Sequence, residues 1–273
     1  SSSNLIRVKS EGYEMDTVNL DNLSVVENEK GRSSSLIRGT ADRFLQNGLN
    51  IGGFDAYPTS NVLKGSGLSS SAAFEVLIGT VLSHLYNGGE ISPVEIAKMA
   101  QYAENVHFGK PCGLMDQMAS SIGGVITIDF ADPQNPVVKQ VDFDFSKSGY
   151  HLCIVDTKGD HADLTDEYAS VTVEMKAVAN TLGVSYLRET SVGELMKKIP
   201  EIRRLYGDRA VLRALHFLRE NERVTQQVKA LENNDFEEFK RLVIESGHSS
   251  FEYLQNVFTT KNVKEQGLSL ALC

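Results

Sequence analysis

The sequence lacks long apolar runs and has few cysteines. No stretch of about 18 consecutive apolar residues occurs, so we expect neither a membrane-spanning helix nor a membrane partner. The three cysteines, Cys112, Cys153 and Cys273, form no Cys-x-x-Cys pair, which removes the usual signal for a zinc or dithiol site. Their odd number, and the absence of a stretch with signal-peptide character, favour a reducing, cytoplasmic location.

Positive charge is also scarce. Lys and Arg number 27 against 36 Asp and Glu, which gives a net charge of −9. A protein that grips nucleic acid along its phosphates needs the opposite balance, so we expect no nucleic-acid partner. A small phosphate ligand is compatible with this charge because it needs only a local site. The composition, with 41% hydrophobic residues, is ordinary for a globular protein and excludes a wholly disordered chain.

The order of apolar segments predicts a mixed fold with its strands concentrated in the first half, which favours the α+β class. Strands are predicted at residues 54–57 and 125–128, along the alternation from Val137 to Phe145, and at the buried-looking run 152–155. Helices are predicted between Ser33 and Gly48, over 72–86, from Pro93 to Val106, and over 114–122, 164–182, 192–199, 210–232 and 235–247.

A domain boundary is predicted at residues 146–149, which read Ser-Lys-Ser-Gly and are short, polar and flexible. The boundary divides the chain into residues 1–147 and 148–273, and the second part is mostly helical. Its first helix has apolar residues at spacings of 4, 3, 4, 3 and 4, which is one helical face. These residues are Leu164, Tyr168, Val171, Met175, Val178 and Leu182.

The most informative stretch is residues 65–73, Gly-Ser-Gly-Leu-Ser-Ser-Ser-Ala-Ala, which leads directly into an apolar helix. Glycines let backbone N–H groups approach an anion, and the helix dipole favours phosphate at its start. The loop is not a Walker A motif, since no Gly-Lys-Ser/Thr follows, nor a Rossmann fingerprint, since the third glycine is missing. The loop is therefore either a phosphate cradle or a flexible linker before a serine-capped helix.

Two carboxylates downstream, Glu104 and Asp116, complete the requirements of a phosphoryl-transfer site. One carboxylate and a loop hydroxyl would hold Mg²⁺ against nucleotide phosphates, while the other would orient and deprotonate the acceptor hydroxyl. Such a base accepts its proton as the new P–O bond develops, a contribution of roughly 10²–10⁴-fold. The alternatives are a solvated helix face for Glu104 and a helix-start charge for Asp116.

Two strings carry a resemblance to a known family. Residues 65–72 resemble the second motif of the GHMP small-molecule kinases, and residues 104–117, with Pro-Cys-Gly-Leu-Met-Asp-Gln, resemble the galactokinases among them. The resemblance implies a two-lobed GHMP-kinase-like fold, with a ribosomal-protein-S5-domain-2-like α/β N-terminal lobe and a more helical C-terminal lobe. It also implies ATP- and Mg²⁺-dependent phosphorylation of galactose at the anomeric hydroxyl, with galactose and ATP as partners.

The resemblance also assigns roles to residues. Asp116 would be the catalytic base, Ser69 and Glu104 would hold Mg²⁺, and Gly113 would contact the sugar through its backbone. Tyr168 matches a tyrosine that closes over the sugar, although it equally fits the helix stripe described above. The residues along the nucleotide phosphates would be Gly65, Ser66, Gly67, Leu68, Ser69, Ser70 and Ser71.

The sequence departs from the family pattern in three places. Leu63 stands where the second motif usually has proline, and no string matches the family's first motif or its glycine-rich third motif. We therefore expect an internal segment of a galactokinase-like protein that is incomplete for catalysis on its own. Such a segment would leave sheet edges and apolar surface uncovered, so we also expect self-association.

Two alternative functions remain compatible with the motifs. One is a galactokinase-like sensor that binds sugar and nucleotide without catalysis, although the intact serines 69–71 disfavour it. The other is a GHMP kinase for a different sugar, such as N-acetylgalactosamine.

Overall fold

The computed structural model describes residues 4–61, 68–155, 157 and 165–273, and the chain divides into two compact units, residues 1–140 and 141–273. The sequence suggested a division after residue 147. Residues 141–147 go with the second unit because the Phe143 and Phe145 rings lie 5.6 and 5.8 Å from that of Phe236. Each unit has a hydrophobic core of its own.

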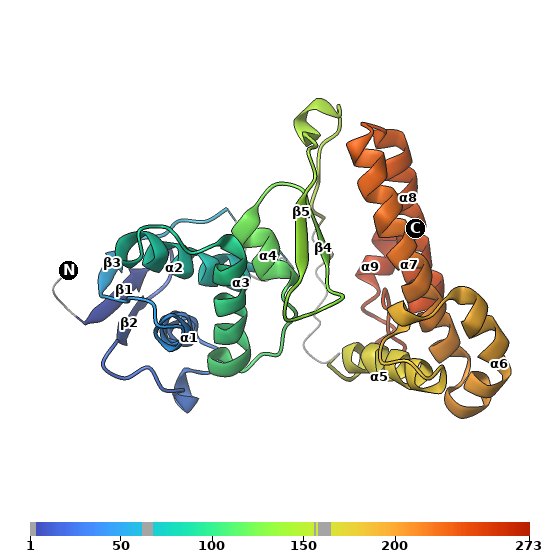
Figure 1. Ribbon diagram of the computed structural model, residues 1–273, viewed down its shortest axis with the longest axis horizontal. Helices are drawn as coiled ribbons and strands as arrows, with labels where there is room; N and C mark the ends of the chain where they lie inside the picture. Colours follow the sequence, from blue (N-terminus) through green and yellow to red (C-terminus); the bar gives the residue numbers. More distant parts are fainter. Residues whose placement is uncertain (1–3, 62–67, 156, 158–164) are drawn as a thin grey trace. The chain divides into compact units, whose positions relative to one another are not determined.

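The first unit is built on a three-stranded sheet of order β2-β1-β3 (Figure 1). Strand β1 (Leu5–Lys9) pairs antiparallel with β2 (Met15–Asn19) and parallel with β3 (Phe54–Ala56). The central strand buries Ile6 and Val8 completely, so its alternate residues form the floor of the core.

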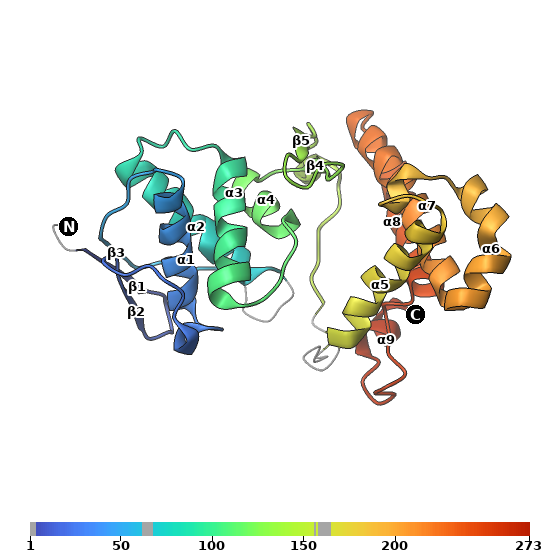
Figure 2. The same ribbon diagram turned by 60° about the horizontal axis from the view of Figure 1, so that its bottom comes forward.

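Helices complete this core, and Figure 2 shows α1 and α2 beside the sheet. Phe44, Ile78, Leu82 and Met99 come from three helices and join the buried strand residues in one hydrophobic cluster. The helix that follows Ser92 begins as predicted, with a Ser92–Glu95 capping box and Pro93 at its first position. The helices are α1 (Ser33–Gln46), α2 (Ser70–Tyr86), α3 (Pro93–Tyr102) and α4 (Met115–Ile122), with a short η1 (Glu27–Glu29) before α1.

Helix α3 continues at Tyr102 directly into a wider, π-helical turn, η2 (Ala103–Phe108). Gly109, with φ of 82°, then ends the helix in the left-handed conformation that glycine adopts without strain. The π turn matters for the site because it carries Glu104 and His107, and both side chains are buried.

A two-stranded hairpin closes the first unit. Strand β4 (Ile126–Asp129) pairs antiparallel with β5 (Val137–Gln140), and its apolar residues pack with Ala97 of α3 and Met118 of α4. The predicted strand through residue 145 was too long. Beyond Gln140 the alternating residues turn into an aromatic cluster, since Phe143 and Phe145 pack on Phe236.

All the regular secondary structure in the described part of the second unit is helical. Val178, Leu195, Ile202 and Ala214, from three helices, are fully buried in its core. The helical elements are η3 (Phe145–Lys147), α5 (Thr165–Thr181), η4 (Leu187–Glu189), α6 (Val192–Tyr206), α7 (Asp208–Glu232), α8 (Phe236–Ser249), η5 (Ser250–Leu254) and α9 (Gly267–Leu272). Among the described residues, no helix is both long and apolar enough to cross a membrane.

One sequence-based prediction in this unit was wrong. Residues 152–155 form no strand, and Leu152, Ile154 and Val155 are 96%, 61% and 73% exposed. A strand is stable only when neighbouring strands satisfy its backbone groups, and every strand within the described ranges lies in the first unit. Apolar character alone therefore misidentified this segment.

Candidate active site

The start of α2 forms the first half of the site. Gly65, Ser66 and Gly67, predicted to line the nucleotide phosphates, lie outside the described residues, and Leu68 is the first described residue of this stretch. Ser69 adopts the left-handed conformation (φ 54°, ψ 48°), an uncommon one for a residue with a side chain. Its Oγ donates to Asp116 Oδ2 at 2.7 Å instead of capping the helix.

This geometry leaves the helix start open to an anion. The first intrahelical bond runs from the Ala73 N–H to the Ser69 carbonyl at 3.1 Å. The N–H groups of residues 70–72 therefore lie ahead of that bond, at the positive end of the dipole of a 17-residue helix. Ser70 and Ser71 add hydroxyl groups at the same place, which is what a phosphate cradle requires.

Glu104 forms the second half of the site, and it is only 2% exposed. The alternative of a solvated helix face is therefore wrong. A buried carboxylate needs donors, and Glu104 has several. Ser71 Oγ donates to its Oε1 at 2.9 Å, Gln117 Nε2 donates to its Oε2 at 2.8 Å, and Lys110 Nζ lies 3.6 Å from Oε1.

Asp116 lies in the first turn of α4, as the sequence predicted, and it is exposed. Its neighbour Gln117 is fully buried and contacts Glu104, whereas Asp116 contacts Ser69. Two consecutive residues of α4 therefore contact the two halves of the site. Ser69 with Asp116 and Ser71 with Glu104 thus form two hydroxyl–carboxylate pairs, which three separate helices bring together.

Glu75 is a site residue that the sequence reasoning missed. It is fully buried one turn after Ser71, and Gln117 Nε2 donates to its Oε2 at 3.3 Å. Burial, together with the charge of Glu104, raises the pKa of Glu75 to about 9, so its carboxyl group is neutral at pH 7. The available signal was a single carboxylate inside the apolar run 72–82.

The loop before α4 offers backbone rather than reactive side chains. Burial and the nearby Glu104 raise the pKa of the Cys112 thiol to about 12, which leaves it protonated and a poor nucleophile. The Cys112 N–H donates to Asn105 Oδ1 at 2.7 Å, which fixes the loop. Gly113 is exposed with open space around it, so its backbone is accessible to a ligand.

The donor set suits Mg²⁺, which prefers oxygen ligands and is commonly held by one or two protein groups together with substrate phosphates. Ser71 and Glu104 place a hydroxyl and a carboxylate in contact beside the helix start. Over the part of the chain that is described, no cluster of three or more His, Cys, Asp or Glu forms a self-sufficient metal site. The resemblance implied Ser69 as the hydroxyl ligand, but the hydroxyl on Glu104 is that of Ser71.

Tyr168, the predicted sugar residue, belongs to the second unit. It is 64% exposed and therefore not part of the buried helix core. With Val171 and Arg213 it lines a cavity of about 860 Å³ within that unit. The Arg213 side chain is 1% exposed and pairs with Glu174 at 3.0 Å, which gives the cavity a rigid charged wall.

Comparison with known proteins defines the class. Residues 35–124 match the family model described as the GHMP kinases N terminal domain, so the first unit carries this domain. The match includes every residue of the two hydroxyl–carboxylate pairs.

The particular relatives within this class are galactokinases. The chain is 30% identical to the galactokinase of Streptomyces coelicolor over 90% of this chain and 62% of that protein. It is 33% identical to the galactokinase of Thermotoga neapolitana over 85% of this chain and 64% of that protein. It thus spans about three fifths of the length of these relatives, and its predicted resemblance to the galactokinases is confirmed.

A solved structure shows the same fold. The structure of Lactococcus lactis galactokinase complexed with galactose matches with a TM-score of 0.73 and covers 96% of this chain and 67% of that one, at 21% identity. The predicted α+β GHMP-kinase-like fold is therefore confirmed.

Proposed function

We propose that this protein transfers the terminal phosphoryl group of ATP to the anomeric hydroxyl of galactose and so forms galactose 1-phosphate. The observation that carries the proposal is the convergence of Ser69 with Asp116 and of Ser71 with Glu104 at the start of α2. A phosphoryl-transfer site needs an anion cradle, a metal-holding carboxylate and a proton acceptor, and these residues supply the three functions side by side.

Each group has a distinct task in this proposal. The N–H groups of residues 70–72 bind phosphate oxygens, and the Gly113 backbone contacts the sugar. Asp116, oriented by the Ser69 hydroxyl, accepts the proton of the attacking sugar hydroxyl as the P–O bond forms. Glu104 and the Ser71 hydroxyl would hold Mg²⁺, which neutralises phosphate charge when bound.

The partners, by the same reasoning, are ATP and galactose, and Tyr168 stays a predicted sugar contact. The names of the relatives support galactose as the substrate. A cytoplasmic location, where both small molecules are available, is part of the proposal.

Galactose-dependent release of ADP tests the function, with galactose, N-acetylgalactosamine and other aldoses compared as acceptors. Asp116→Asn should lower kcat by about 10²–10⁴-fold, because it removes the proton acceptor, while the KM for ATP stays close to that of the wild type. Asp55→Asn is the matched control, since Asp55 pairs with Arg7 on the sheet and lies outside the site.

Each result has a clear meaning. If another sugar supports turnover and galactose does not, that sugar replaces galactose as the proposed substrate. Binding of ATP and galactose without turnover would support the sensor instead. Because the chain spans about three fifths of its relatives' length, the assay should compare the 273-residue chain with a longer protein that contains it. We expect the longer protein to be the faster of the two.

A further inference from the structure

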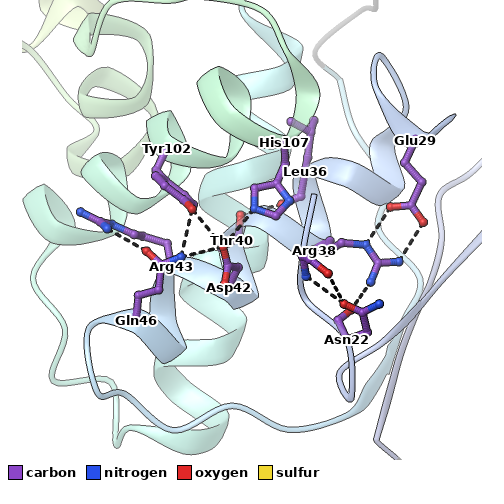
Figure 3. Close-up of polar contacts among 11 residues, drawn as sticks. Asn22, Glu29, Leu36, Arg38, Thr40, Asp42, Arg43, Gln46, Tyr102 and His107 are labelled. Carbon is purple, nitrogen blue, oxygen red and sulfur yellow. Dashed lines mark hydrogen bonds and ion pairs between the residues drawn. The ribbon is translucent and has the colours of Figure 1, made fainter. Parts of the chain in front are cut away.

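The π turn η2 presents two buried side chains to three neighbouring helices. Glu104 contacts Ser71 of α2 and Gln117 of α4, as described above. His107, which is 1% exposed, contacts Asp42 of α1 (Figure 3). The same turn therefore connects the proposed metal ligand to a polar cluster that the proposed reaction does not use.

A single oxygen organises that cluster. Asp42 Oδ2 accepts a hydrogen bond from Tyr102 Oη at 3.0 Å and one from Gln46 Nε2 at 2.8 Å, and it lies 3.0 Å from His107 Nε2. Tyr102 is the residue before the π turn, and His107 is near its end. Asp42 thus holds both ends of the turn that carries Glu104 (Figure 3).

The backbone of the turn also rests directly on α1. A Cβ atom on Gly39 would lie 2.8 Å from Ala103 Cα, so only glycine permits this approach. At the other end, the Gly31 N–H donates to the Phe108 carbonyl at 3.1 Å. The segment before α1 is itself held by Glu29, whose two carboxylate oxygens each accept a 2.8 Å hydrogen bond from the largely buried Arg38.

We infer that Asp42, Tyr102 and His107 form a positioning clamp that fixes the π turn and, through it, directs the Glu104 carboxylate toward Ser71. This inference rests on the proposed function for the identity of Glu104 as a metal-holding group. None of the three clamp residues is a catalytic residue, because their contacts join α1 to the turn and not to Ser69, Ser71 or Asp116.

The inference predicts a specific defect. Asp42→Asn removes the charged acceptor and places an amide where the Tyr102 hydroxyl, the Gln46 amide and the His107 ring now converge, so the turn loosens and Glu104 loses its fixed direction. The Mg²⁺ concentration that gives half-maximal ATP binding should rise about tenfold, the lower end of what loss of a supporting hydrogen bond costs a metal site. Binding of ATP without a divalent cation should change by less than about twofold, because the start of α2 is untouched.

Two measurements on the purified chain test the clamp. Hydrogen exchange of the amides of residues 103–108 reports the turn without any ligand, and ATP titration at varied Mg²⁺ reports the site. Asp55→Asn is the matched control for loss of a carboxylate from the same unit. Tyr102→Phe is the second variant, in case Asp42→Asn does not fold. It removes one hydrogen bond and no charge, so it should show a smaller defect of the same kind.

Faster exchange confined to 103–108, together with the raised Mg²⁺ requirement, supports the clamp. Exchange and Mg²⁺ dependence that match those of Asp55→Asn in both variants would overturn it. If the wild type binds ATP with no effect of Mg²⁺, the metal role in the proposed function fails. The exchange data then still decide whether Asp42 holds the turn.

Discussion

Glu75→Gln should stabilise the first unit, and the gain should grow with pH. Glutamine has the shape and neutrality of the protonated carboxyl group that the structure favours. The pKa of Glu75 is about 9 in the folded protein because of burial and the nearby Glu104, against an ordinary value of 4.5. Between these two values the folded state binds more protons than the unfolded state, so the wild type loses stability as the pH rises.

The magnitude can be worked from this proton difference. One proton of difference changes the free energy of unfolding by up to about 1.4 kcal/mol per pH unit. Between pH 5.5 and 7.5 the advantage of Glu75→Gln over the wild type should therefore increase by about 2–3 kcal/mol. Urea unfolding followed by circular dichroism at several pH values, with a chelator present, measures this difference.

Glu29→Gln provides a control in which the pKa shift of the replaced carboxyl group has the opposite direction. The hydrogen bonds from Arg38 lower the pKa of Glu29, so its contribution to stability is present above the ordinary pKa of 4.5 and is lost as the pH falls through the lowered value. Glu29→Gln should be less stable than the wild type by an amount that stays constant from pH 5.5 to 7.5. Parallel stability curves for Glu75→Gln and the wild type over that range would refute the reasoning.

The remaining predictions concern the neighbouring residues. Ser71→Ala should raise the Mg²⁺ requirement for ATP binding more than Ser69→Ala does, because the Ser71 hydroxyl lies on Glu104; the reverse order would favour Ser69 as the ligand. Gly39→Ala should lower stability by about 1–3 kcal/mol in thermal unfolding, since its Cβ meets the backbone of the π turn. Iodoacetamide at pH 8 should label the exposed Cys153 well before Cys112, whose pKa is raised to about 12, and peptide mass spectrometry would show equal labelling if this is wrong.

Local chemistry made part of the site predictable from the sequence. The Ser92-Pro93 signal placed the start of α3, and the position of Asp116 after the Cys112-Gly113 loop placed it in the first turn of α4. The serine-rich loop led into a helix as expected, with the described part of α2 beginning at Ser70. These features depend on a few adjacent residues, so the sequence contains the signals that determine them.

The features that escaped prediction depend on long-range contacts. Glu104 lies on the same helical face as the buried Ile96 and Ala100, but a carboxylate is buried there only because Ser71 and Gln117, distant in the sequence, donate hydrogen bonds to it. Glu75 and Gln117 meet although they are 42 residues apart, and neither position has a local pattern that announces it. The apolar run 152–155 shows the converse, because strand formation needs pairing that side-chain character does not supply.

The wide turn at residues 103–108 also sets the rotational phase at which the chain leaves the helix. A π turn accommodates an additional residue within a helix, and one residue corresponds to a rotation of about 100° around the axis. If the same six residues were wound as a regular α-helix instead, Gly109, and with it the loop that leads to Asp116, would be rotated by about that angle relative to α3. The width of this turn, and not only the identity of its residues, is therefore part of what aligns Glu104 and Asp116 on the same helix start.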